Sequence, residues 1–144
     1  MKRNIFLFAF ISTLLMGCSK DDGASSLDRN TALITVKDEA GASIPLTVIY
    51  AFSDFSWQTN AQKTDFAEWT KTTDEKGLTH FDNLNDDLLV QFNTLMSQNP
   101  MMPESKFKFR EGVFHFVILH KKKPFTTTVV FEKGEQRKFV ITLK

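Results

Sequence analysis

Short stretches of alternating apolar and polar residues follow one another along the chain after residue 30. In 32–37 and in 138–143 every second residue is apolar, which is typical of β-strands that bury one face. The stretch 113–119 is apolar except for His115, and such a run indicates a strand covered on both faces. The same reasoning predicts further strands; these are 46–52, 67–73, 78–82 and 126–131.

A turn signal lies between two of the predicted strands. The carboxylate of Asp74 can accept hydrogen bonds from the backbone of the turn, and Gly77 can adopt a positive φ without steric cost. Alternating residues follow directly after Gly77. We therefore expect a β-hairpin that joins 67–73 to 78–82.

The segment 85–99 has apolar residues at helical spacing. Two aspartates near its start suit a helix N-terminus, and Pro100 would end the helix. We predict a helix here, although a strand through Leu88, Val90 and Phe92 is the alternative. A second, shorter helical turn is predicted within 60–69, with Phe66 and Trp69 on one side.

Strands of this length, separated by turns rich in Gly, Pro and charged residues, favour a sandwich or barrel. We expect an all-β fold with one inserted helix: an antiparallel seven-stranded Greek-key sandwich of the transthyretin-like or immunoglobulin-like kind. The predicted domain covers 31–144, which is long enough to bury a core.

The first residues have the pattern of a targeting segment. Met1-Lys2-Arg3 is basic, and the apolar run 5–16 is too short for a comfortable transmembrane helix, so 1–17 reads as a signal peptide. Leu14-Leu15-Met16-Gly17-Cys18 resembles the lipobox of bacterial lipoproteins. The resemblance implies cleavage before Cys18 and lipidation of its thiol; the alternative is an ordinary buried thiol.

A polar tether, 18–30, is predicted between Cys18 and the domain. Ser19-Lys20-Asp21-Asp22 resembles the export signal of surface-exposed lipoproteins in some Gram-negative bacteria. The expected location is therefore the outer membrane, with the domain exposed at the cell surface. Cys18 is the only cysteine, so no disulfide within the chain can stabilise the fold.

Charge is nearly balanced after the signal peptide. Residues 19–99 hold 6 basic and 13 acidic side chains, whereas 100–144 hold 10 basic and 4 acidic ones. In an antiparallel sandwich such halves can pair across strands. The balance argues against a nucleic-acid partner, which requires net positive charge.

The sequence offers little catalytic or metal-binding chemistry. His80, His115 and His120 lack metal-ligand spacing and are expected to be one half-buried and two exposed side chains. The acidic residues of 82–87 lack the spacing of an EF-hand, and helix capping is the preferred reading. We expect no catalytic residues, no metal, no cofactor and no enzymatic activity.

Aromatic residues of one region are the candidate ligand-binding side chains. Large aromatics in a long connection between strands can form a sugar-stacking platform or a partner surface. The alternative is a second small core beneath the segment 53–71. The candidates are Tyr50, Phe55, Trp57, Phe66 and Trp69.

Several turn and core stretches resemble carboxypeptidase regulatory-like, or transthyretin-like, domains. The stretches are 35–41, Ile44-Pro45, 72–84, 112–117 and 139–143, and 85–111 is longer than that pattern usually allows. The resemblance implies a seven-stranded antiparallel sandwich that serves as a non-catalytic accessory or stalk module at cell surfaces.

The expected function is a lipid-anchored surface module that binds a protein partner or forms a subunit of a surface assembly. The alternative is a carbohydrate-binding module that uses the aromatics of 53–71.

Overall fold

The computed structural model describes residues 29–144. Their secondary structure comprises seven strands and three helical segments. The order along the chain is β1 (Asn30–Asp38), β2 (Val48–Ser53), α2 (Asp54–Thr59), the 3-10 helix η1 (Thr64–Phe66), β3 (Trp69–Thr72), β4 (Leu78–Leu84), α3 (Asp87–Gln98), β5 (Val113–His120), β6 (Lys123–Val130) and β7 (Gln136–Leu143).

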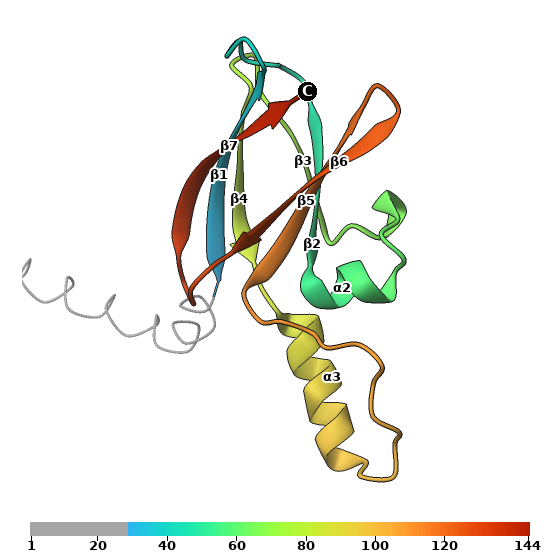
Figure 1. Ribbon diagram of the computed structural model, residues 1–144. Helices are drawn as coiled ribbons and strands as arrows, with labels where there is room; N and C mark the ends of the chain where they lie inside the picture. Colours follow the sequence, from blue (N-terminus) through green and yellow to red (C-terminus); the bar gives the residue numbers. More distant parts are fainter. Residues whose placement is uncertain (1–28) are drawn as a thin grey trace, which may run out of the picture.

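The strands form two sheets that pack face to face (Figure 1). One sheet has the order β4-β1-β7, and the other has the order β3-β2-β5-β6. The all-β sandwich with seven strands and one longer inserted helix is therefore confirmed. The helix α3 lies at the end of the sandwich where β1 begins, which we call the base. The C-terminus and the β5–β6 turn lie at the opposite end, which we call the far end (Figure 1).

One strand pairing differs from the expected antiparallel arrangement. β1 pairs with β7 in parallel, from Thr31 opposite Gln136 to Asp38 opposite Leu143. The alternation of apolar residues in both strands is compatible with either direction, because pattern alone does not fix strand orientation. The remaining pairs between strands are antiparallel.

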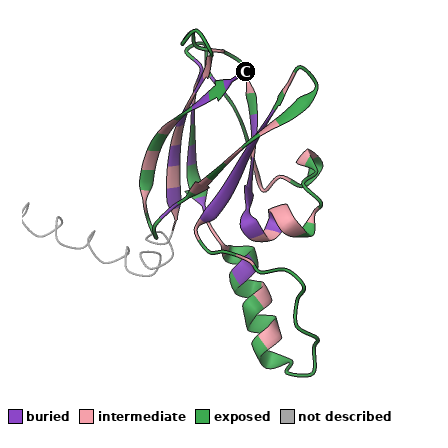
Figure 2. Ribbon diagram, in the orientation of Figure 1, coloured by how far each residue is buried: buried purple, intermediate pink, exposed green. Residues whose placement is uncertain are grey.

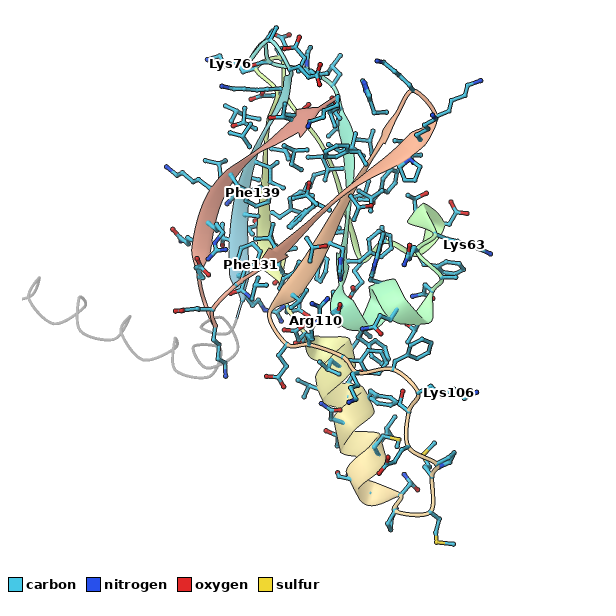
Figure 3. The ribbon with its side chains drawn as sticks, viewed as in Figure 1. Lys63, Lys76, Lys106, Arg110, Phe131 and Phe139 are labelled. Carbon is cyan, nitrogen blue, oxygen red and sulfur yellow. The ribbon has the colours of Figure 1, made fainter. Side chains whose placement is uncertain are left out.

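The core lies between the two sheets. Phe114, Phe116 and Ile118 of β5 face the inner side of the four-stranded sheet, where they meet the buried side chains of β1. Phe131 and Phe139, both labelled in Figure 3, reach the same core from the segment after β6 and from β7. The predicted inward faces of the first and last strands are confirmed, and Figure 2 shows the buried residues concentrated in the strands.

The predicted hairpin at Gly77 is wrong, although its turn is correct. Gly77 has a φ of 72°, and Asp74 Oδ1 accepts from the backbone N–H of Lys76 (2.8 Å) and Leu78 (2.9 Å). However, β3 pairs with β2 and β4 pairs with β1, so the turn carries the chain from one sheet to the other. Turn chemistry specifies the change of direction, whereas the hydrophobic core specifies the partner of each strand.

The domain begins one residue earlier than predicted. Asn30, assigned to the tether from the sequence, is the first residue of β1 and is buried. Its Oδ1 accepts from Glu135 N at 2.9 Å, so a polar side chain is satisfied inside the fold. A β-bulge follows, because Asn30 lies opposite Leu84 but Ala32 lies opposite Phe81.

The helix predicted over 85–99 is confirmed as α3, and the short helical turn predicted within 60–69 is present as η1, although Trp69 lies in β3 and not in that turn. The structure also has α2 directly after β2, which was not predicted. Ser53 ends β2 and also caps α2, because its Oγ accepts from Ser56 N at 3.3 Å. The capping serine and the acidic residue that follows it are a helix-start signal that the sequence analysis missed.

The predicted signal peptide (1–17), Cys18 and most of the predicted tether lie outside the described residues. Within residues 29–144, no helix is both long enough and apolar enough to cross a membrane.

Candidate functional site

The helix α2 covers part of the outer face of the four-stranded sheet (Figure 1). It is fixed at its start by Glu68, whose Oε2 accepts from Ser53 N (2.6 Å) and Ser53 Oγ (2.7 Å). Burial raises the pKa of Glu68, and the hydrogen bonds from Ser53 oppose that rise. Ser53 ends β2 and Glu68 directly precedes β3, so these hydrogen bonds join the two ends of the connection between the strands.

Asp54 is the centre of a polar cluster beneath α2. Its side chain is 1% exposed. Oδ1 accepts from Arg110 Nη2 at 3.0 Å and from His115 Nε2 at 2.8 Å. Oδ2 accepts from Gln58 Nε2 at 2.8 Å and from Arg110 N at 2.9 Å. The carboxylate therefore joins α2, β5 and the segment that precedes β5, and Figure 3 shows Arg110 at this junction.

His115 lies between the carboxylate and the indole of Trp57. The Trp57 and His115 rings are stacked, with centroids 4.9 Å apart and an interplanar angle of 14°. Trp57 also meets Phe52 edge-on at 5.2 Å. His115 Nδ1 lies 2.9 Å from Thr128 Oγ1 on β6. One half-buried and two exposed histidines were expected; instead His115 is buried, His120 is half-buried and His80 is exposed.

The charges of Asp54 and His115 follow from these contacts. Burial by itself would raise the pKa of Asp54, but the hydrogen bonds from Arg110, His115 and Gln58 outweigh it and lower that pKa to about 2. Burial lowers the pKa of His115, so the imidazole is neutral at pH 7. Because Asp54 is ionised, the proton of the neutral His115 ring lies on Nε2, which donates to the carboxylate. His115 Nδ1 then accepts from the Thr128 hydroxyl.

A carboxylate, an imidazole and a hydroxyl in a row have the residue types of a hydrolytic triad. The arrangement differs, however, because here the carboxylate bonds Nε2 and the hydroxyl bonds Nδ1. The pockets of the described chain discussed below are lined by other residues. We therefore interpret the cluster as the polar contact that fixes α2 on the sheet.

The structure does not bring the five candidate aromatics together. Tyr50 and Trp57 lie on the outer side of the four-stranded sheet, whereas Trp69 meets Phe114 of the main core at 5.9 Å. Phe66 is exposed. Phe55 contacts Phe92 and Phe109 instead, at 5.4 Å and 4.8 Å.

Replacing Trp57 with Ala is expected to lower the free energy of unfolding by about 2 kcal/mol. The half-buried indole covers Phe52 and His115, so its removal exposes both rings. Urea unfolding followed by far-UV circular dichroism measures the loss. The exposed Phe66→Ala variant, which should change the free energy by less than about 0.5 kcal/mol, is the control. Equal losses in the two variants would contradict the packing role of Trp57.

A pocket of about 390 Å³ lies at the base, where the first described residues meet the start of α3. Asp86 is its central acid. Asp86 Oδ2 accepts from Gly112 N at 2.8 Å, and Oδ1 is buried without a hydrogen-bond partner among residues 29–144. Burial, followed by repulsion from Glu111, Asp54 and Asp87, raises the pKa of Asp86 despite the bond from Gly112. Asp86 occupies the N-cap position of α3, but its side chain makes no capping hydrogen bond, so the predicted capping by this acid is wrong; Asn85 Oδ1 accepts from Asp87 N instead.

Asp86→Asn is expected to leave the free energy of unfolding at pH 7 unchanged or higher, whereas Asp86→Ala should lower it by about 1–2 kcal/mol. Asn keeps an acceptor for Gly112 N and removes a buried charge. Because the folded pKa of Asp86 is raised, the stability that Asp86 contributes is complete below its unfolded pKa and is lost as pH rises through the folded pKa. Urea titrations at neutral and mildly acidic pH test both points; a loss in Asp86→Asn as large as in Asp86→Ala would refute them.

A second pocket, of about 360 Å³, lies at the far end of the sandwich. Its rim is apolar and exposed: Leu46 is 72% exposed and Leu119 is 51% exposed, and Val48 lies nearby on β2. Tyr50 and His120 supply polar groups. We call Leu46, Val48, Leu119 and the turn Lys121-Lys122-Lys123 the far-end surface.

The far-end surface also contains strained backbone. Leu46 has a φ of 51°, and the turn residues Lys121 and Lys122 have φ values of 51° and 64°. Side chains other than glycine rarely adopt such angles, and each costs about 1–3 kcal/mol. Two positive φ values suit a two-residue hairpin turn, where Asn-Gly is the usual choice. At this surface an exposed leucine and two exposed lysines therefore have backbone conformations that are unfavourable for their residue types.

Among residues 29–144, no group of three or more His, Cys, Asp or Glu side chains could hold a metal ion. A scan against protein-family models finds no match, and a search of curated proteins also finds none. Solved structures similar to this chain include wild-type catechol 1,2-dioxygenase from Acinetobacter radioresistens and a point mutant of it, each with 17% identity and a TM-score of 0.40. The match covers 77% of this chain but 38% of the dioxygenase, and at this TM-score it carries no argument about function.

Proposed function

We propose that this chain is a non-enzymatic, lipid-anchored β-sandwich displayed at the outer membrane, where it binds a protein partner or forms a subunit of a surface assembly. The observation that carries the anchor is the stretch Leu14-Leu15-Met16-Gly17-Cys18, placed directly after a basic start and an apolar run. Cleavage before Cys18 and lipidation of its thiol would leave the sandwich attached through the short tether.

The far-end surface supports the binding role. The described chain begins at the base, and the far-end surface lies at the opposite end of the sandwich (Figure 1). A module anchored through its N-terminal segment would present this end away from the bilayer. Exposed leucines beside three consecutive lysines suit a partner whose surface combines apolar and acidic side chains.

The carbohydrate-binding alternative has weaker support. Stacking platforms need aromatic faces that are exposed and close together. Trp69 packs on the core, Phe55 packs against Phe92 and Phe109, and Trp57 has one face on His115. A glycan array probed with the wild-type domain and with Trp57→Ala tests the alternative directly.

The anchor is tested with Cys18→Ala in the full chain. Mass spectrometry of the membrane fraction should find acyl chains on Cys18 in the wild type, and Cys18→Ala should yield an uncleaved or soluble protein. Unmodified Cys18 in the membrane fraction would refute the anchor.

The binding role is tested with the double variant Leu46→Ser, Leu119→Ser in anchored protein. Partners that cross-link to the wild type at the cell surface should be lost, while the thermal melt stays close to that of the wild type. Val140→Ser, 52% exposed on β7, is the matched control and should retain them. Identical partners for all three proteins would refute a role for the far-end surface.

A further inference from the structure

We propose that α3 and the return segment 99–112, together called the arm, touch the lipid bilayer through an apolar tip. This inference rests on the lipid anchor of the proposed function. It assigns a second membrane contact to the described part of the chain, separate from Cys18.

The arm extends away from the two sheets at the base (Figure 1). Figure 2 shows that most of α3 and of the return segment is exposed, and Leu89 is the buried residue of the helix. Its tip nevertheless carries large apolar side chains. Met101 is 95% exposed and Met102 is 52% exposed, and Leu95 near the end of α3 is also exposed. A concentration of such side chains on a projecting element marks a contact with an apolar partner.

The arm is fixed to the sandwich by an aromatic cluster. Phe92 of α3 and Phe109 of the return segment lie 5.4 Å apart, and both contact Phe55 of α2. Arg110 then joins the end of the return segment to Asp54. The direction of the arm is thus set by the packing of α2, and its apolar tip is held away from the core.

The chain enters the fold beside the first turn of α3. Arg29 Nη2 lies 3.5 Å from Asp87 Oδ2, the first residue of the helix. The eleven residues from Cys18 to Asp28 can span at most about 40 Å when fully extended. The twelve residues of α3 rise about 18 Å. With Cys18 in the bilayer, the tip of the arm can reach the membrane whenever the tether leaves the base within about 18 Å of it.

The return segment between the tip and the sandwich carries residues that suit the lipid interface. Lys106 and Lys108 are exposed, and Figure 3 shows Lys106 on the return segment. Lysine stems can lie along lipid chains while their ammonium groups contact phosphate headgroups. Glu104 is the acid between the tip and these lysines. Methionine is flexible and apolar, which suits insertion into a fluid layer.

An apolar tip this small would bind a membrane weakly on its own. The lipid on Cys18 removes that difficulty, because it holds the arm close to the bilayer at a high effective concentration. A second copy of this chain or a protein partner could also cover the tip. The chain enters the fold at the base, the same end of the sandwich from which the arm projects, and this favours the bilayer.

The test uses the full lipidated chain reconstituted in vesicles of phosphatidylethanolamine and phosphatidylglycerol. The same lipidated protein in detergent is the first comparison. The soluble form of the Cys18→Ala variant, without detergent, is the second. Trypsin cleavage at Lys106 and Lys108, and hydrogen exchange of 95–109, should slow on the order of tenfold in vesicles. The double variant Met101→Ser, Met102→Ser should lose most of this protection. Val140→Ser, as exposed as Met102, should keep it.

The outcomes distinguish a failure of this inference from a failure of the proposed function. Absence of acyl chains on Cys18 would remove the anchor and the inference together. A lipidated protein whose arm is equally accessible in vesicles and in detergent would overturn the inference and leave the anchor intact. Protection of the soluble form that grows with its concentration would assign the tip to a second copy. Protection in native membranes but not in protein-free vesicles would assign it to a protein partner.

Discussion

Replacing Asp54 with Ala is expected to lower the free energy of unfolding by about 3–5 kcal/mol. Its side chain accepts hydrogen bonds from Gln58, Arg110 and His115 in a site that is closed to water. Alanine would leave the N–H groups of His115 and of the Arg110 backbone without an acceptor. The same substitution detaches α2 from β5, so the indole of Trp57 should also lose its place over His115.

The decrease in the free energy of unfolding at acidic pH is a second test of the role of Asp54. Its folded pKa is about 2, below the ordinary value of 3.8. A depressed pKa contributes stability that is complete above the unfolded pKa and is lost as pH falls through the folded pKa. The wild type should therefore lose about 2 kcal/mol from this group between about pH 4 and pH 2. Asp54→Asn should not show that loss.

His115 adds a loss of the same sign at higher pH. Its folded pKa is lowered, so the folded state binds fewer protons than the unfolded state below pH 6.5. Stability should fall as pH drops below that value, and His115→Gln should weaken this dependence.

Urea unfolding of Asp54→Ala and Asp65→Ala measures the effect against a control. Asp65 is an exposed acid in η1, so its removal should change the free energy by less than about 0.5 kcal/mol. If the two variants unfolded at the same urea concentration, Asp54 would not be the centre of the cluster that we describe.

Replacing Gly112 with Ala is expected to lower the free energy of unfolding by about 3 kcal/mol or more. Gly112 has a φ of 70°, and a Cβ at this position would lie 2.4 Å from the backbone oxygen of Phe131. Relief of the clash must move either strand β5 or the end of β6. Both movements break the bond from Phe131 N to Gly112 O (2.7 Å) and disturb the bond from Gly112 N to Asp86.

Gly41→Ala is the matched control for backbone strain. Gly41 has a φ of 85°, but nothing lies within 4 Å of the Cβ that alanine would add. Its cost should be limited to the left-handed backbone, about 1 kcal/mol. The difference between the two variants in thermal or urea unfolding isolates the contact with Phe131. Equal losses would show that this contact is relieved without cost.

Local patterns along the chain predicted most of the secondary structure. The alternation in β1 and β7, the long apolar run of β5 and the helical spacing of α3 each depend on neighbours within a few residues. Asp74 and Gly77 predicted their turn for the same reason. The parallel pairing of β1 with β7 and the separation of β3 from β4 involve residues far apart in the chain, which no local pattern contains.

The polar cluster was not predicted from the sequence. Asp54, Arg110, His115 and Thr128 come from four segments, and none has a motif spacing to another. A helix-start signal at Ser53 and Asp54 was present in the sequence, and a polar histidine inside an apolar strand indicates a buried partner. Neither signal identifies the partner.

The strands, the inserted helix and the lipobox-like stretch that ends at Cys18 can be recognised in the sequence, because each depends on adjacent residues. The folded chain is needed to show which strands share a sheet, that Trp57 covers His115 while Trp69 faces the core, and that the methionines after α3 remain exposed. Burial depends on how distant segments assemble. The same apolar side chain is core or contact surface according to what distant segments place against it.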